Sequence, residues 1–332
     1  METLLDEETM EQIKQRIGPT LYRQRVYFQL HRAANMFSVG TTLFHIENMP
    51  WLHNSFYRFL RFSGLIFLGK RNYLDVQVRR SVLASERLPE AFHGFRVLHL
   101  SDLHIDLDRD LALTDRLIAK LRGLEYDLCV LTGDYRASTI GEFETSVREM
   151  EKIRRHLKGP VLAVLGNHDF IEMAPALERM GYRFLLNENV PIEREGSTVY
   201  VAGVDDPHIY RTDNFEKACD GIPHDGFSLL LSHSPETYKV AAACGFDMML
   251  CGHTHGGQVC FPGGVAIIHN SKSPHRMTAG IWSYHDMIGY TSRGTGACGI
   301  PVRFFCPPEI VLHELRREPS PLVRSRRRVH GR

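Results

Sequence analysis

Short apolar runs, separated by segments with helical periodicity, constrain the fold of this 332-residue chain most strongly. Apolar runs of about 4–8 residues are typical of strands buried inside a sheet. Helical patterns lie between several of the runs, as at 111–121 and 143–157. Strands that alternate with helices predict a layered α/β domain. The expected strands are 95–100, 128–131, 161–165, 199–204, 228–231, 248–250, 265–268 and 310–312.

The two ends of the chain differ from this pattern. Over residues 1–72 the apolar residues recur at helical spacing, and Gly18-Pro19 is a helix stop. A further helix is expected at Trp51–Leu68. The residues after 315 are rich in arginine, which is typical of a disordered tail. We therefore predict a helical N-terminal extension (1–72), one α/β domain (73–315) and a basic disordered tail (316–332).

The composition narrows the cellular setting. The formal net charge of +1 gives no strong signal for nucleic-acid binding. The seven cysteines form no CxxC pair, and several lie in apolar runs, as in a reducing compartment. The acidic first residues do not resemble a signal peptide, and no apolar stretch reaches the length of a membrane span. A cytoplasmic location is expected.

Polar side chains follow five of the expected strands, at the point where each strand ends. In open α/β sheets, ligand sites form beyond the carboxyl ends of the strands. We therefore expect these side chains to meet at one edge of the sheet. They are Asp102, His104, Asp134, Asn167, His168, Asp169, His233, His253 and His255.

The donor atoms in this set are carboxylate oxygens, an amide oxygen and imidazole nitrogens, without a thiolate. Such a set suits hard or borderline divalent metals. A carboxylate is the best bridge between two ions, and Asp134 is the expected bridge. One ion would then be completed by Asp102, His104 and His255, and the other by Asn167, His233 and His253.

Two divalent ions activate water and neutralise phosphate oxygens, so this ligand set predicts phosphoester hydrolysis. His168 need not be a ligand and would protonate the leaving oxygen or bind a phosphate oxygen. Asp169 is expected to orient His168 and raise its basicity. Arg293, flanked by Gly294, is a candidate clamp for a second phosphate. An ordinary surface arginine is the alternative interpretation.

The motifs resemble those of the calcineurin-like metallophosphoesterase superfamily over about residues 73–315. The motifs are Asp102-x-His104, Gly133-Asp134, Gly166-Asn-His-Asp169, His233 and Gly252-His-x-His255. The resemblance implies a four-layer β-sandwich flanked by helices. It also implies a binuclear centre with the metal roles given above. The expected metal is Mn²⁺, with Fe²⁺ and Zn²⁺ as alternatives.

Five further segments are similar to bacterial phosphodiesterases of the YkuE/YaeI kind. They are Leu100–His104, Gly203–Asp206, Gly252–Gln258, Ser292–Gly294 and Cys306–Ile310. This subgroup includes a type of UDP-2,3-diacylglucosamine pyrophosphatase of lipid A synthesis. The resemblance therefore implies hydrolysis of a phosphodiester or pyrophosphate bond, with a lipid-linked nucleotide as a candidate substrate.

The Trp51–Leu68 segment combines aromatic residues with Arg58 and Arg61. Basic charge and aromatics on one helix suit an interfacial membrane segment or a lid over acyl chains. The arginine-rich tail suits anionic headgroups at the inner face of a membrane. A helix packed onto the domain and a solvated terminus are the alternatives.

Three other interpretations stay open. A general phosphodiesterase or nuclease would use the same metals, and a metal-binding scaffold without catalysis would lack part of the site. His208 is either a loop residue or a residue that approaches the site. Asp205 and Asp206 either form the turn before Pro207 or contact the substrate.

Overall fold

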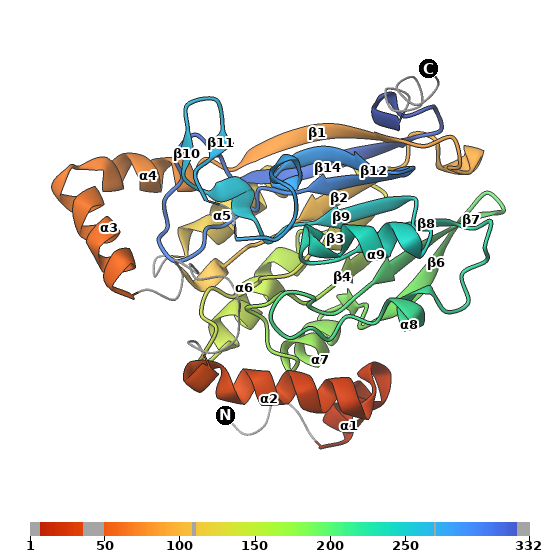
Figure 1. Cartoon of the computed structure of the whole chain (residues 1–332), viewed down its shortest axis with the longest axis horizontal. Coiled ribbons are helices and arrows are strands. Elements are labelled where there is room, and N and C mark those ends of the chain that lie inside the picture. Colours follow the sequence, from red (N-terminus) through yellow and green to blue (C-terminus); the bar gives the residue numbers. More distant parts are fainter. Residues whose placement is uncertain (1–6, 36–49, 108–110, 269, 324–332) are drawn as a thin grey trace.

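Two six-stranded sheets form the centre of the molecule. The computed structural model describes residues 7–35, 50–107, 111–268 and 270–323, and Figure 1 shows their arrangement. The first sheet has the strand order β1-β14-β2-β3-β4-β5. Its strands are β1 Gln77–Ala84, β2 Arg96–Leu100, β3 Leu128–Leu131, β4 Val161–Ala163, β5 Arg183–Phe184 and β14 Glu309–Arg316.

The second sheet has the order β12-β13-β9-β8-β7-β6, and a separate two-stranded hairpin joins β10 to β11. The strands of this sheet are β6 Glu188–Arg194, β7 Ser197–Gly203, β8 Phe227–Leu231, β9 Met248–Cys251, β12 Gly280–Tyr284 and β13 Met287–Thr291. The hairpin consists of β10 Cys260–Phe261 and β11 Val265–Ala266.

Helices cover the outer faces of both sheets and form the N-terminal extension. The α-helices are α1 Glu7–Ile17, α2 Pro19–Asn35, α3 Pro50–Phe62, α4 Leu65–Tyr73, α5 Ala112–Leu121, α6 Glu144–Arg154, α7 Met173–Glu178, α8 Phe215–Cys219 and α9 Tyr238–Ala243. Short 3₁₀ turns are η2 Glu90–Phe92, η3 Ile105–Leu107, η4 Pro235–Thr237, η5 His255–Gly257 and η6 His275–Met277.

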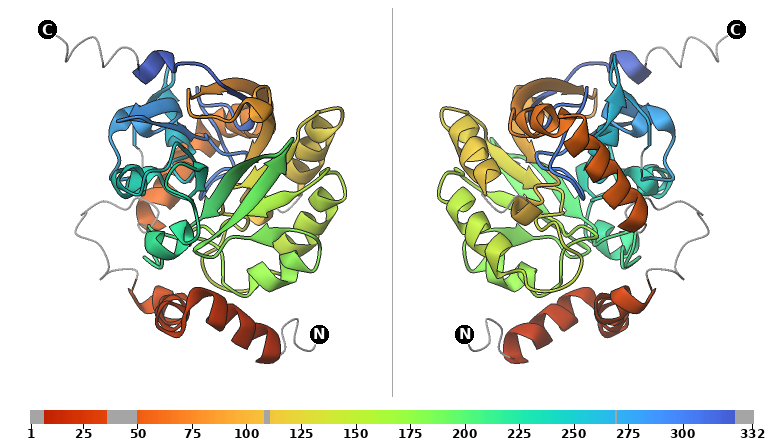
Figure 2. Two further views of the ribbon diagram at one scale, coloured as in Figure 1. Left: turned by 90° about the vertical axis from the view of Figure 1, so that its right-hand side faces the viewer. Right: turned by 90° about the vertical axis from the view of Figure 1, so that its left-hand side faces the viewer.

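Alternation of side chains along the central strands produces the layers. In β2, Leu98 lies in the core beneath α5, α6 and α7, whereas its neighbour Val97 faces the second sheet. In β8, Leu229 faces the first sheet, and Leu230 packs with residues of α8 and α9. The resulting order of helices, sheet, sheet and helices is visible edge-on in Figure 2. The predicted four-layer fold is confirmed.

Strand direction decides where the functional loops gather. β2, β3 and β4 run parallel to one another in the first sheet, as do β7, β8 and β9 in the second. Parallel neighbours end at the same edge of a sheet. The loops after these strands therefore meet at one end of the sandwich.

Several elements differ from the sequence-based expectation. The sequence patterns predict neither β6 nor the β12–β13 hairpin. β13 contains Gly289, over which the Trp282 ring lies so closely that a Cβ atom would come within 2.2 Å of it. Only Val265 and Ala266 of the expected strand 265–268 are extended, and they pair with β10 outside both large sheets.

The expected single helix over Trp51–Leu68 is instead two helices, α3 and α4. Gly64 lies between them with a φ of 73° and caps α4. This left-handed conformation costs glycine little, and it turns the chain sharply at this point. Leu60 and Ile66 pack on Ile300 and Val302, so one face of the pair contacts the domain. Among the described residues, no helix is both long enough and apolar enough to cross a bilayer.

The chain remains packed beyond the expected start of the disordered tail. Ser320 is buried, and Leu322 and Val323 pack against the core between the sheets. The rest of the predicted tail, 324–332, lies outside the described residues.

The N-terminal extension is attached to the domain through buried polar contacts. Ile13 and Ile17 of α1 join the main core. Arg25 of α2 is fully buried and forms an ion pair with Asp205 at 2.7 Å. Its other terminal nitrogen donates to the carbonyl oxygen of Asp169 at 3.0 Å. α2 therefore contacts two loops that lie next to the predicted metal ligands.

We expect Arg25→Met to lower the free energy of unfolding by about 3–5 kcal/mol, because it leaves the buried Asp205 carboxylate without its counter-charge. The double variant Arg25→Met/Asp205→Asn should recover much of this loss. Arg23→Met, at an exposed position of the same helix, is the matched control and should change stability by less than about 0.5 kcal/mol. Urea unfolding measures all three, and equal stabilities for the Arg25 and Arg23 variants would contradict the anchoring role.

Candidate metal centre

The predicted ligands converge where the parallel strands of the two sheets end. Asp102 and His104 follow β2, Asp134 follows β3, and Asn167 follows β4. His233 follows β8 of the second sheet. His253 and His255 follow β9. All seven side chains are buried.

Five of these residues adopt a left-handed backbone conformation. The φ angles are 50° at Asp102, 41° at His104, 57° at Asp134, 72° at His253 and 51° at His255. For a residue with a Cβ atom this conformation costs about 1–2 kcal/mol. Such strain accumulates at functional sites, where the surrounding structure imposes it. The loops thus hold these side chains in positions that a relaxed backbone would not give.

The glycines that precede the ligands allow the loops to approach one another. A Cβ atom on Gly252 would lie 1.9 Å from the Ser101 hydroxyl oxygen. One on Gly133, where φ is 92°, would lie 2.5 Å from the Gly166 amide nitrogen. Any side chain at these positions would separate the loops. The glycines of the Gly-Asp and Gly-His motifs therefore have a direct steric role.

One group of donor atoms consists of Asp102, His104 and His255. The Nδ1 atom of His104 lies 2.9 Å from the carbonyl oxygen of Arg136. A carbonyl only accepts, so Nδ1 carries the hydrogen and Nε2 presents its lone pair to the site. Nε2 of His255 lies 3.1 Å from Nε2 of His104 and 3.6 Å from a carboxylate oxygen of Asp102.

A second group consists of Asp134, His233 and His253, with Asn167 beside them. His233 Nδ1 lies 2.7 Å from the Thr132 carbonyl oxygen, and His253 Nε2 lies 2.7 Å from that of Asn270. By the same reasoning, both of these nitrogens carry hydrogens, so His233 Nε2 and His253 Nδ1 are the nitrogens that face each other, at 3.2 Å. The amide oxygen of Asn167 lies 2.9 Å from His233 Nε2.

Asp134 lies between the two groups. Its Oδ2 atom is 3.2 Å from His233 Nε2 and 3.6 Å from His104 Nε2. The other oxygen accepts the backbone N–H of His168 at 2.8 Å. This is the position expected of a bridging carboxylate, with one oxygen facing both groups.

Burial and neighbouring charges set the protonation states of the site. Burial lowers the pKa of His253 and His255 well below the usual value, so both are neutral imidazoles, the form that binds metals. Burial also lowers the pKa of His233, but the carboxylates of Asp134 and Asp102 outweigh it and raise the pKa to about 10. Burial raises the pKa of Asp134, but His233 and His168 bring it well below the usual range.

The donor set fits divalent cations. Around His233 Nε2, the three electron-pair donors Asp134 Oδ2, Asn167 Oδ1 and His253 Nδ1 lie within 3.2 Å. The raised pKa of His233 means that a proton on Nε2 lies among these donors in the metal-free protein, and a divalent cation bound there would take the place of that proton. Carboxylate, amide oxygen and imidazole are suitable ligands for Mn²⁺, Fe²⁺ and Zn²⁺.

His168 lies beside the centre, and its Nε2 atom is 4.0 Å from Oδ2 of Asp134. Its Nδ1 donates to the carbonyl oxygen of Ala137 at 2.6 Å. The expectation that Asp169 orients this ring stays a prediction. The Asp169 carboxylate accepts the backbone N–H groups of Asp134, Tyr135 and Gly166 at 2.7–2.8 Å. Asp169 thus ties the loops after β3 and β4 together.

The structure also locates the residues whose roles were left open. Arg293 pairs with the buried Glu309 at 2.8 Å, and its role as a phosphate clamp stays a prediction. Asp206 accepts three backbone N–H groups of the following turn, as a turn former does. The ring of His208 lies 4.1 Å from that of His253, so this residue does approach the site.

One network behind the centre was not predicted. Ser101 donates to Oδ2 of Asp102 at 2.5 Å, and Thr132 donates to Ser101 at 2.7 Å. Because the Thr132 hydroxyl already donates its only hydrogen to Ser101, it must accept the hydrogen bond from His99 Nε2, at 2.9 Å. Every hydrogen in this buried chain points toward the Asp102 carboxylate, as in the outer-shell networks that orient metal ligands.

A buried arginine supports the other side of the site. Arg303 is fully buried and donates to the carbonyl oxygens of His255, Arg293, Gly294 and Gly296. It thereby fixes the loop that carries His255. No local motif marks Arg303 or His99, because the contacts that tie them to the site join distant residues: His255 lies 48 residues from Arg303, and Thr132 lies 33 residues from His99.

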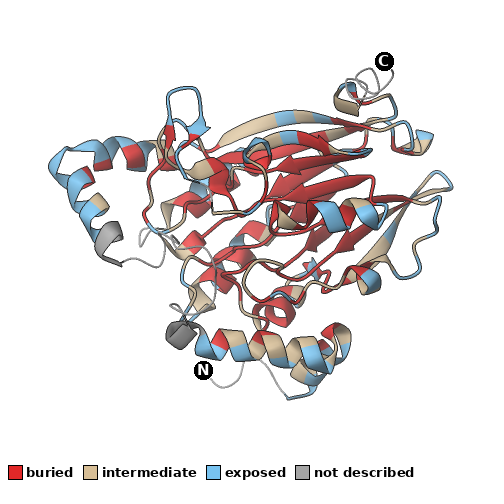
Figure 3. Cartoon of the chain, viewed as in Figure 1, coloured by how far each residue is buried: buried red, intermediate tan, exposed pale blue. Residues whose placement is uncertain are grey.

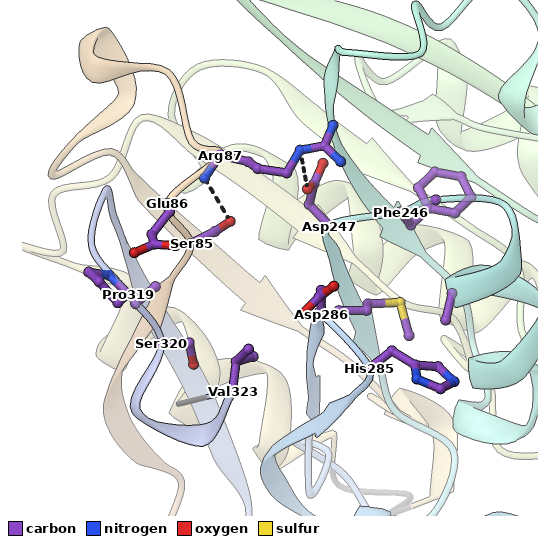
Figure 4. Close-up of a pocket in the computed structure, with 14 residues that line it drawn as sticks. Ser85, Glu86, Arg87, Phe246, Asp247, His285, Asp286, Pro319, Ser320 and Val323 are labelled. Carbon is purple, nitrogen blue, oxygen red and sulfur yellow. Dashed lines mark hydrogen bonds and ion pairs between the residues drawn. The ribbon is translucent and has the colours of Figure 1, made fainter. Parts of the chain in front are cut away.

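A pocket of about 430 Å³ lies at the opposite end of the sheets (Figure 4). It is lined by residues that follow β1 and β14 or precede β9 and β13, and these strand ends face away from the metal ligands. Arg87 and Asp247 form an ion pair at its edge, at 3.2 Å. The pocket is therefore separate from the candidate metal centre.

Comparison with known proteins agrees with this geometry. A family model described as calcineurin-like phosphoesterase matches residues 95–257, which contain all seven predicted ligands.

Three relatives extend the similarity beyond that region. The uncharacterized metallophosphoesterase YkoQ of Bacillus subtilis is 29% identical over 267 residues, covering 77% of this chain and 96% of that protein. YkuE of Bacillus subtilis, also an uncharacterized metallophosphoesterase, is 26% identical over 75% of this chain and 89% of that protein. The phosphodiesterase YaeI of Escherichia coli is 27% identical over 67% of this chain and 82% of that protein. The predicted resemblance to YkuE and YaeI is confirmed.

The hydrogen-bond chain behind Asp102 predicts an effect of Thr132→Val on stability and metal binding. The substitution keeps the shape but leaves the His99 N–H buried without an acceptor, which costs about 1–3 kcal/mol. Loss of an outer-shell partner should also weaken binding of Mn²⁺ by about 10–100-fold. Urea unfolding of the metal-free protein and calorimetric titration with Mn²⁺ measure the two effects.

Thr132→Ser retains the hydroxyl and should restore both properties. Thr114→Val is the matched control, because the Thr114 hydroxyl is buried without a hydrogen-bond partner among the described residues. Equal Mn²⁺ affinity in the Thr132→Val and Thr114→Val proteins would show that the chain does not support Asp102.

Proposed function

Because this chain belongs to the calcineurin-like phosphoesterase family and is a hydrolase of phosphoester bonds, we propose that it cleaves a phosphodiester or pyrophosphate bond at a binuclear metal centre. The observation that carries the proposal is the position of Asp134, with one carboxylate oxygen facing both groups of histidines.

In this proposal Asp134 bridges two divalent ions. Asp102, His104 and His255 complete the ligands of one ion, and Asn167, His233 and His253 complete those of the other. When bound, such ions lower the pKa of water and neutralise phosphate oxygens. Mn²⁺ is the proposed metal, with Fe²⁺ and Zn²⁺ as alternatives that accept the same donor set.

His168 is proposed as the proton donor or as a hydrogen-bond donor to the phosphate. Its Nδ1–H is occupied by the Ala137 carbonyl, so Nε2 is the nitrogen that faces the centre. A proton held on Nε2 can be given to the leaving oxygen. Asp169 would contribute indirectly by holding the Asp134 and Asn167 loops in register. Arg293 is proposed as a further phosphate contact through the part of its side chain that is exposed.

A lipid-linked nucleotide such as UDP-2,3-diacylglucosamine is the proposed substrate. Support comes from an apolar rim, by which we mean the exposed side chains of Phe59, Phe62, Phe67, Leu68, Phe261 and Val265. Phe62 is 90% exposed and Phe67 is 78% exposed. Figure 3 shows that α3 and α4 are exposed over much of their surface.

The apolar rim is connected to the metal loops. Gly69 of α4 contacts Val302, and the backbone of Phe304 bonds to Cys260 at the start of β10. Ala266 of β11 in turn lies against Gly257, two residues after His255. Acyl chains held on the rim would therefore lie near the end of the sheets where the ligands meet.

We also propose that the rim contacts the inner face of an anionic membrane. Arg58, Arg61, Lys70 and Arg71 are exposed around the apolar side chains of α3 and α4. Basic residues around exposed aromatics suit an interfacial contact. The seven free cysteines support a cytoplasmic location.

We expect Asn167→Ala and His168→Ala each to lower hydrolysis of an aryl phosphodiester by at least about 100-fold in the Mn²⁺-loaded protein. The first variant removes a proposed ligand, and the second removes the proposed proton donor. His156→Ala, at an exposed position two residues after the end of α6, is the matched control. Full activity in both site variants, with unfolding curves like that of the parent, would refute the proposed mechanism.

Substrate choice is tested with a panel of phosphate compounds. UDP-2,3-diacylglucosamine should be hydrolysed faster than UDP-N-acetylglucosamine, which has the same pyrophosphate but no acyl chains. An aryl phosphomonoester and a cyclic nucleotide complete the panel. Equal rates on the two UDP compounds would remove the lipid-linked substrate while leaving phosphoester hydrolysis intact.

The membrane contact predicts that the protein pellets with vesicles containing phosphatidylglycerol. A buried Phe contributes about 1.5–3 kcal/mol, so Phe62→Asp/Phe67→Asp should weaken vesicle binding by at least about tenfold. Deletion of 324–332 should reduce binding at low salt only, because exposed charges are screened by salt.

Val240→Asp is the control for the added charge, since Val240 is exposed on α9 outside the rim. A double Phe variant that pellets like the Val240 variant would exclude the rim as the contact surface.

A further inference from the structure

One of the seven cysteines, Cys298, lies at the edge of the metal centre. The Sγ atom of Cys298 and one ring nitrogen each of His104 and His168 lie within 4.8 Å of one another. The two histidines are buried, and Cys298 is partly exposed. The rings of His104 and His168 are in edge contact, with centroids 4.7 Å apart. A soft donor is thus added to a set that otherwise offers only nitrogen and oxygen.

Hydrogen bonds hold the backbone on either side of Cys298 and thereby keep its thiol beside the two histidines. The side-chain amide of Gln258 accepts the Cys298 N–H at 2.7 Å and donates to its carbonyl oxygen at 2.9 Å. Two residues earlier, the N–H of Gly296 donates to the carbonyl oxygen of Asp102 at 2.7 Å. The loop is therefore held both by the metal-ligand loop after β9 and by the one after β2.

We propose that His104, His168 and Cys298 form a further metal site that takes a thiophilic divalent ion such as Zn²⁺ or Cd²⁺. The site goes beyond the proposed hydrolysis, because it neither requires nor contributes to that reaction. It shares His104 with the group that contains Asp102 and His255. One imidazole nitrogen binds one ion, so occupation of the thiophilic site and of the complete catalytic centre exclude each other.

The donor chemistry suits such an ion. Zn²⁺ binds Cys sulfur at about 2.3 Å and His nitrogen at about 2.0–2.1 Å, with tetrahedral geometry. Those lengths put neighbouring donor atoms about 3.3–3.6 Å apart, which small side-chain rotations reach from the observed separation. On binding, the S–H bond of Cys298 breaks, a metal–sulfur bond forms, and the proton passes to solvent.

Selectivity follows from the thiolate. Mn²⁺ prefers carboxylate and carbonyl oxygens, whereas Zn²⁺ accepts thiolate and lies far above Mn²⁺ in intrinsic affinity. The ion would also occupy the Nε2 side of His168, the nitrogen that faces the centre. Excess Zn²⁺ should therefore inhibit a Mn²⁺-loaded enzyme through Cys298.

The test is a Cd²⁺ titration of the full-length protein, followed by the ultraviolet charge-transfer absorption of a cadmium–thiolate bond. Cys298→Ser should lose this absorption, or the part of it that saturates at the lowest Cd²⁺ concentration. Cys244→Ser is the matched control, because Cys244 is an exposed thiol at the end of α9. The measurement needs no substrate, so it is independent of the proposed hydrolysis.

A second measurement follows inhibition of the Mn²⁺-loaded enzyme by added Zn²⁺. The Zn²⁺ concentration for half inhibition should rise at least about tenfold in Cys298→Ser and stay unchanged in Cys244→Ser. Equal cadmium–thiolate absorption in the parent and Cys298→Ser proteins would overturn the site. Equal Zn²⁺ sensitivity of the two proteins would overturn its inhibitory effect.

Discussion

The buried carboxylate of Asp134 between two groups of imidazoles is the interaction on which the site depends. Its Oδ2 atom faces His104 and His233, which belong to different sheets of the sandwich. Burying these carboxylates and imidazoles together costs free energy, and the left-handed loops add strain. The cost is sustained because the surrounding contacts are rigid: Asp169 ties the loops after β3 and β4, and Arg303 holds the loop of His255.

Much of this site is readable in the sequence because its parts are local. Each ligand follows directly after an apolar run, and parallel strands bring their carboxyl ends to one edge. The glycines of the motifs mark places where loops nearly touch, as Gly252 does against Ser101. The division of the donors around Asp134 also follows the predicted grouping.

What sequence patterns miss is long-range. Arg25 and Asp205 are separated by 180 residues, and the local sequence around neither residue indicates a buried ion pair. Cys298 and the β12–β13 hairpin are missed for related reasons. Cys298 is brought to His168 only by tertiary packing. The β12–β13 hairpin lacks the aliphatic run that marks a buried strand, because the Trp282 ring packs over Gly289 there. The turn at Gly64 divides a continuous aromatic segment into two helices. The sequence pattern does not predict this division, because periodicity alone does not show where a helix ends.

The contacts of Arg303 connect the metal centre with the helices that carry the apolar rim. Its backbone N–H donates to the carbonyl oxygen of Gly69 in α4, and its own carbonyl accepts from Asn72. Its guanidinium donates to the carbonyl oxygen of His255 at 2.9 Å. One buried residue therefore contacts both α4 and a metal-ligand loop. Since the proposed ions would contact only the phosphate group, selection among phosphoesters would depend on surfaces outside the centre. Arg303 links one of these surfaces, α4, to the loop that carries His255.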